Sequence, residues 1–246
     1  MEKHNFKNSK LLILILIISN LLYSQNETIV PKNGAIVFIK KEIITDTLLY
    51  KKSFDKSFYK MLLEAKKEVL MERGNKISQI PDSINQQLNQ MFEMMKSIAM
   101  QEIISNKPKS LIKYHHTYNN YEIEEFISVN DKYLNKKKIT NSTDFQNDDL
   151  LAITGIEEYK NETKTIKGLK CFRVVMYYFD LEMPSGFKSL LNIMELWVTE
   201  DIKSKFHPFI KSNEILEKYF PLQVKHTIKD VEGMYTSYEI LDFSLK

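Results

Sequence analysis

Hydrophobic and polar residues alternate with a period of two over most of this chain, which predicts a protein built mainly of β-strands. The clearest case is a pair of segments, 165–180 and 193–201, that are dense in β-branched and aromatic residues. A loop containing Pro184 and Gly186 separates them. This composition predicts two adjacent strands of one sheet. We expect the pair to form the centre of the hydrophobic core.

Further strands are predicted on both sides of this pair. Asn119 and Asn120 form a turn that joins two of them into a hairpin. Lys160 and Asn161 are expected to form another turn, just before the central pair, and Glu214–Lys218 can form a short helix. The polar segment 135–149 predicts a surface connection with at most one short strand. The additional strands are expected at 35–49, 111–118, 121–129, 150–159, 222–229 and 234–245.

The hydrophobic period changes to three and four between residues 53 and 105, which predicts two amphipathic helices. The first has apolar residues recurring over 54–69, with Ser53 or Asp55 as its N-cap. The second begins after Pro81, and one face of it carries several methionines. Such a face either packs in an ordinary core or adapts to apolar ligands, and core packing is the commoner case.

These elements predict an α+β fold with one large, curved, mostly antiparallel sheet, or partial barrel, of about eight to ten strands. The two helices are inserted between the first strand and the second. They must bury their apolar faces, so we expect them to pack on the concave side of the sheet. Residues 25–246 then form a single β-rich domain with a helical insertion at about 53–105.

The first residues have the parts of a secretory signal peptide. Lys3, Lys7 and Lys10 precede an apolar run over 11–18, and small and polar residues follow up to Gln25. We expect residues 1–24 to be removed on export. The alternative is an uncleaved anchor, although the apolar run is shorter than the ~20 residues that a spanning helix needs. With no cysteine near the cleavage site, attachment of a lipid to a new N-terminal cysteine is excluded.

Charge and cysteine content narrow the possible partners. Removal of residues 1–24 takes three Lys and one Glu from 35 basic and 32 acidic residues, which leaves a net charge of +1. That balance argues against nucleic acid or an anionic surface as the main partner.

Cys171 is the only cysteine, so no disulfide forms within the chain. It is either a reactive thiol or a small buried apolar residue, and its place in a strand favours burial.

No group of residues in the sequence points to a particular catalysed reaction. His115 and His116 are neighbours on a strand, so their side chains point to opposite faces and do not share a metal ion. His226 lies on the apolar side of its strand, where a buried, hydrogen-bonded imidazole is expected. The paired carboxylates fit solvated edges and turns, and motifs for phosphate, nucleophilic or zinc chemistry are absent. We therefore predict no catalytic residue, metal ligand or cofactor.

Three motifs follow one another in the last third of the chain. They are Ile166-x-Gly168-x-x-Cys171, Trp197-Val-Thr199-Glu-Asp201 and Phe220-Pro221-Leu222-x-Val224. With a signal segment that ends in Ser-Gln, they resemble the GLPGLI family of exported proteins of Gram-negative bacteria, or a sister group, since both glycines of the naming motif are missing. The resemblance implies a periplasmic or extracellular location and a fold similar to the periplasmic lipoprotein carriers, in which helices plug an open curved sheet. It implies no established activity.

Two functions follow from these expectations. The first is a non-enzymatic envelope protein that binds a lipid, another apolar ligand or a lipidated protein between sheet and helices. Fold analogy suggests that Met91, Met95, Phe172 and Trp197 line that hollow. The second is a structural or protein-interaction module, whose sheet edge or Lys/Asn-rich loop contacts another envelope protein. An enzyme is the third candidate, and we expect a monomer in each case.

Overall fold

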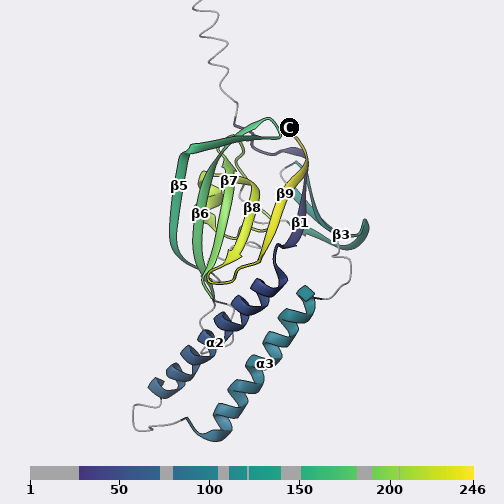
Figure 1. The fold of residues 1–246 in the computed structure, drawn as a ribbon. Helices are drawn as coiled ribbons and strands as arrows, with labels where there is room; N and C mark the ends of the chain where they lie inside the picture. The colour runs from purple at the N-terminus through teal and green to yellow at the C-terminus, as the bar shows by residue number, and fades with distance from the viewer. Residues whose placement is uncertain are drawn as a thin grey trace, which may run out of the picture.

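Nine strands form one antiparallel sheet in the part of the chain that this computed structural model describes (Figure 1). The described residues are 28–72, 80–104, 111–120, 122–139, 151–181, 190–204 and 206–246. The strands are β1 Asn33–Ile44, β2 Ile112–Asn119, β3 Glu122–Val129, β4 Lys132–Ile139, β5 Leu151–Ile166, β6 Leu169–Asp180, β7 Asn192–Thr199, β8 Phe220–Ile228 and β9 Met234–Leu245. The helices are α2 Thr47–Glu72, α3 Asp82–Ile104 and α4 Asn213–Lys218. The predicted α+β class with a large, open sheet is confirmed.

The strand order is β4-β3-β2-β1-β9-β8-β7-β6-β5, and each neighbouring pair is antiparallel. The first strand therefore lies inside the sheet, between β2 and the last strand, β9. The β1–β9 register runs from Gly34 opposite Leu245 to Ile44 opposite Met234. This pairing joins the two ends of the described chain and unites two sets of consecutive strands, β1–β4 and β5–β9, into one layer.

The predicted central pair forms as expected. β6 pairs antiparallel with β7, and Val174 and Met176 of β6 pack with Leu196 and Val198 of β7 in the largest buried cluster. All four side chains are almost fully buried. Cys171, at the start of β6, is also buried, as predicted.

The inner face of the bent sheet is covered by the chain's own segment 206–219. Ile215 and Leu216 of α4 pack against β6 and β7. Phe209 stacks on Tyr238 of β9, with 4.0 Å between ring centroids. Figure 1 shows α4, the yellow-green helix, inside the bend behind β6 and β7. Apolar side chains of this connection thus fill the face that was expected to receive the inserted helices.

The prediction that the two inserted helices pack on the concave side of the sheet is wrong. Figure 1 shows α2 and α3 leaving one end of the sheet as an antiparallel hairpin. Only the base of the hairpin shares a buried cluster with the sheet end, where Tyr50 and Phe54 of α2 pack with Val231 and Met100 of α3 packs against them. Farther out, Met61 of α2 packs with Phe92 of α3. Since segment 206–219 already occupies the inner face, the helices bury their apolar sides against each other.

The helical insertion begins six residues earlier than predicted. The side chain of Asp46 caps α2, because its Oδ1 atom accepts the backbone N–H groups of Leu48 and Leu49, both at 2.9 Å. The chain also turns here, where the N–H of Thr45 donates to the carbonyl of Gly233 at 2.9 Å. Residues 45–49, expected to continue the first strand, instead form this turn and the start of the helix.

Two further predictions need correction. The turn expected at Lys160 and Asn161 does not form, because β5 runs unbroken for 16 residues. A register shift between Tyr159 and Thr163 accommodates these residues as a bulge against β6. The segment expected to be mostly a connection begins inside a regular strand, β4. The rest of that segment, and the predicted signal segment 1–24, lie outside the described residues.

Candidate functional site

The helical hairpin of α2 and α3, which we call the helical arm, carries most of the exposed apolar side chains. Ten large apolar side chains are exposed in the described ranges, and seven belong to this arm. The arm makes up only about a quarter of all the residues that the structure describes. Such a concentration marks a candidate contact surface. The seven are Leu48, Leu49, Tyr59, Leu63, Met71, Met94 and Ile98.

The arm is fixed to the sheet at its base by hydrogen bonds to the β8–β9 turn. The buried Ser53 Oγ accepts the N–H of Glu232 at 2.9 Å, and the buried Ser57 Oγ donates to the carbonyl of Asp230 at 3.2 Å. Lys60 forms an ion pair with Asp230 at 3.0 Å. Three successive turns of α2 are therefore tied to one turn of the sheet, which sets the direction in which the arm projects.

Gly233 completes this attachment by allowing close contact between two backbones. It has a φ of +78°, a conformation that glycine adopts at little cost. A Cβ atom here would collide with the carbonyl oxygen of Asp46 and would lie 2.8 Å from the backbone nitrogen of Tyr50. No other residue type allows this turn to pack directly on the start of α2.

One side of α3 carries an apolar stripe. Met91, Met94, Met95 and Ile98 stand at positions i, i+3, i+4 and i+7, so they lie along one side of the helix. Met94 is 59% exposed and Ile98 is 53% exposed, while Met91 and Met95 are half-buried. Flexible thioether side chains fit partner surfaces of different shapes. The stripe therefore has the chemistry of a helix-packing surface.

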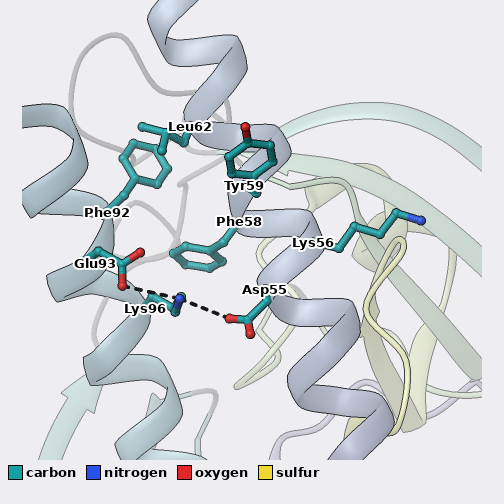
Figure 2. A pocket seen from close by; sticks show the side chains of 8 residues that line it. All are labelled: Asp55, Lys56, Phe58, Tyr59, Leu62, Phe92, Glu93 and Lys96. Atoms are coloured by element: carbon teal, nitrogen blue, oxygen red, sulfur yellow. Dashed lines mark ion pairs between the residues drawn. The ribbon is translucent and has the colours of Figure 1, made fainter. Parts of the chain in front are cut away.

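A cleft of about 420 Å³ opens between α2 and α3 (Figure 2). Phe58 and Phe92 form its inner part, with 6.3 Å between ring centroids in an edge-to-face arrangement. Tyr59, which is 62% exposed, stands at its mouth. The cleft has room for one or two side chains of a partner protein. Its lining residues are Asp55, Lys56, Phe58, Tyr59, Leu62, Phe92, Glu93 and Lys96.

Around Lys96, the polar rim of this cleft has a net negative charge. The Lys96 ammonium lies 3.3 Å from Asp55 and 3.4 Å from Glu93, as the dashed lines in Figure 2 show. Slight burial lowers the pKa of Lys96, but the hydrogen bonds and charges of Asp55 and then Glu93 outweigh it and raise the pKa. One ammonium thus faces two carboxylates, while Lys56 points away from them. Beside the aromatic floor, this rim suits an apolar side chain that is followed by a basic one.

The four residues predicted to line one ligand site are not brought together. Met91 and Met95 lie on the arm, outside the hollow of the sheet. Phe172 packs edge-on against Tyr219, with 5.2 Å between ring centroids. Trp197 points to the opposite face of the sheet, because Phe172 is paired with the residue that follows it. The prediction of a shared site fails because the helices stay outside the hollow.

The histidines of the sheet have structural partners. His226 is half-buried, its Nε2 lies 2.9 Å from Asn192 Oδ1, and burial lowers its pKa to about 4. The predicted hydrogen bond of this imidazole is confirmed, while its burial is only partial. His116 is buried with Nε2 2.9 Å from Glu125, whereas His115 contacts Ser128 at 3.1 Å. Across the described ranges, no three His, Cys, Asp or Glu side chains gather as a metal site would require.

Comparisons with protein-family models, with curated proteins and with solved structures found no match. The resemblance to the GLPGLI family therefore stays a prediction from short motifs. Among the helices within the described ranges, none is both long and apolar enough to cross a membrane.

The arm left a signal in the sequence that the predictions did not use. In α2, Met61 and Ala65 are buried toward α3, yet Tyr59 and Leu63 of the same turns are exposed. A helix that packs on one sheet needs a single apolar side. Large apolar residues on two sides indicate a second contact surface.

Proposed function

We propose that the protein is a non-enzymatic protein-interaction module of the bacterial envelope and that the helical arm is its contact surface. The observation that carries the proposal is the concentration of seven of ten exposed large apolar side chains on these two helices. Export rests on the sequence of residues 1–24 alone. The buried Cys171 is compatible with an oxidising compartment, since no disulfide has to form.

The way in which the arm is held supports contact with a protein partner. Ser53, Ser57 and Gly233 fix its base, so the outer turns of α2 and α3 are presented in a defined direction. A rigid surface loses less conformational entropy when a partner binds than a flexible one does. Helices with apolar stripes commonly bind an amphipathic helix or segment of another protein.

A lipid carrier receives less support from the same structure. Segment 206–219 covers the inner face of the sheet, and Ile215 and Leu216 contribute to the buried cluster there. The proposed ligand residues Phe172 and Trp197 point to opposite faces. A ligand between sheet and helices would need both the segment and the helices to move. Protein contact at the arm needs no such change.

Site-specific photo-crosslinking in living cells tests the proposal. A photoreactive amino acid replaces Tyr59 or Met94 on the arm and, as the control, Leu241 on β9, which is also exposed at 43%. We expect discrete protein adducts at the two arm positions and none at position 241. Absence of adducts at both arm positions, with normal amounts of folded protein, would refute the proposed function.

A second variant separates the cleft from the stripe. The double substitution Asp55→Asn and Glu93→Gln removes the negative rim but keeps the shape of the cleft. If the cleft binds a basic segment, adduct yield at position 59 falls while that at position 94 is unchanged. Equal yields with and without the double substitution would contradict the basic chemistry inferred for the partner.

A further inference from the structure

One side of α3 carries a seam of residues spaced alternately by three and four. This spacing keeps the residues in line along a helix, and it is the pattern by which one helix packs lengthwise on another. Four of the six are apolar, and the other two are uncharged glutamines. Two residues of the seam, Met94 and Ile98, are more than half exposed. The six residues are Ile84, Gln87, Met91, Met94, Ile98 and Gln101.

The seam is also flanked by uncharged residues up to Gln101, and Glu102 is the first charged residue beside its end. Between positions 88 and 101, Gln90 and Ser97 lie on one side of it, and Leu88 and Met95 lie on the other. The charged Glu93 and Lys96 belong to the cleft, on a different side of α3. A strongly charged partner helix would lose hydration against this face without gaining ion pairs. A second copy of the chain presents the same neutral, apolar face and meets no such cost.

We propose that two copies of this chain associate through the α3 seam, with the two helices antiparallel. The inference rests on the proposed function, since it names the partner of one surface of the arm. It replaces the expectation of a monomer. An antiparallel pair is related by a two-fold axis, so each copy contributes the same patch. Met91 and Met94 of one copy then lie beside Met94 and Met91 of the other.

The projecting arm makes this arrangement sterically simple. Figure 1 shows α3 extending from one end of the sheet. Two antiparallel arms therefore place the two sheets at opposite ends of the helix pair, where they do not overlap. A contact along one helix of about 35 Å is smaller than a standard stable interface. We expect the dimer to dissociate at micromolar rather than nanomolar concentrations.

Sedimentation equilibrium of the mature protein, purified from cells that export it, tests the proposal. The mean mass of the wild-type protein should rise from one chain toward two as the concentration approaches about 0.5 mM. Met94→Glu places two carboxylates at the two-fold seam, so the dissociation constant should rise at least about 30-fold. Met71→Glu is the matched control, because Met71 is exposed to a similar extent, 64% against 59% for Met94, but lies on α2. It should leave the dissociation constant unchanged.

Crosslinking between cysteines provides an independent readout. Met94→Cys should be joined between two copies by a short bis-maleimide, whereas Met71→Cys should not. The native Cys171 does not interfere, because it is buried. Far-UV circular dichroism and the fluorescence of Trp197 confirm that each variant is folded.

The outcomes separate this inference from the proposed function. A wild-type protein that stays at the mass of one chain up to about 0.5 mM overturns the dimer. Equal effects of Met94→Glu and Met71→Glu also overturn it. If the dimer fails but position 94 still crosslinks to a different protein in cells, the arm keeps its proposed function. If neither is observed, both proposals fall.

Discussion

His207 makes the stability of this fold depend on pH. Its imidazole is almost fully buried, and Nε2 lies 3.0 Å from the carbonyl oxygen of Pro221. Nδ1 accepts the backbone N–H groups of Phe209 and Ile210, each at 3.3 Å. The neutral ring, protonated at Nε2, satisfies all three contacts. A second proton on Nδ1 would face two donors in the core.

The size and sign of the effect follow from the pKa of His207. Burial, and secondarily the charge of His116, lower this pKa from 6.5 to about 3, although the hydrogen bond to Pro221 opposes the shift. The unfolded chain therefore binds more protons than the folded chain between pH 6.5 and 3. Stability is full above pH 6.5 and declines as the pH falls through this window. At pH 5.0 the unfolded state gains about 2 kcal/mol from this one site, because about 1.5 pH units cost about 1.36 kcal/mol each.

Urea unfolding at pH 7.5 and at pH 5.0 measures this loss. Trp197, the only tryptophan, reports on the sheet through its fluorescence, and circular dichroism gives a second signal. The variant His207→Gln keeps a donor for the carbonyl of Pro221 but does not titrate. It should be less stable than the wild-type protein at pH 7.5, yet the difference between the two should shrink by about 2 kcal/mol at pH 5.0. His115→Gln is the control, because His115 is only half-buried and its substitution should change the pH dependence much less.

The reasoning is refuted if the wild-type protein and His207→Gln lose the same free energy of unfolding between the two pH values. His226, whose pKa burial lowers to about 4, contributes about 2 kcal/mol to both proteins and cancels in this comparison. Surface carboxylates do not disturb it. Glu162, whose pKa Arg173 lowers, stays largely ionised in the folded and unfolded states at pH 5.0.

Three further predictions address the arm, the thiol and the signal segment. In urea unfolding, Gly233→Ala should destabilise the protein by at least about 2 kcal/mol more than Gly168→Ala. Both glycines have a positive φ, but of the two only Gly233 lacks room for a Cβ atom. Equal losses would contradict the role of Gly233 in attaching the arm. Burial raises the pKa of Cys171 to about 11. Ellman's reagent should therefore react with this thiol at pH 8 only as the protein unfolds in urea. Prompt reaction in the native protein would show an accessible thiol. Mass spectrometry of exported protein should find a chain that begins at Gln25, whereas an intact residue 1 would favour the anchor.

The sequence by itself was sufficient for most of the strands and for both long helices. The alternation over 169–180 and 192–199 is strong enough to fix a strand pair, because every second residue must enter the core. The helix at 82–104 follows from its period and from Pro81. Local rules were less successful at residue boundaries. Asp46 caps a helix that starts inside an expected strand. The Lys160–Asn161 turn is replaced by a bulge in β5, because the residues on both sides of it pair with β6.

Only the tertiary structure decided where the helices lie. An amphipathic period shows that a helix buries one side, but it does not show whether a sheet or another helix covers that side. Segment 206–219 has little regular hydrophobic periodicity, but its aromatic and aliphatic side chains pack on the inner face of the sheet and cover it. The helices were then left to pack on each other, with Met94 and Ile98 in solvent. Which segment buries a given face of the sheet depends on contacts between residues that are far apart in the sequence, and these contacts form only when the whole chain folds.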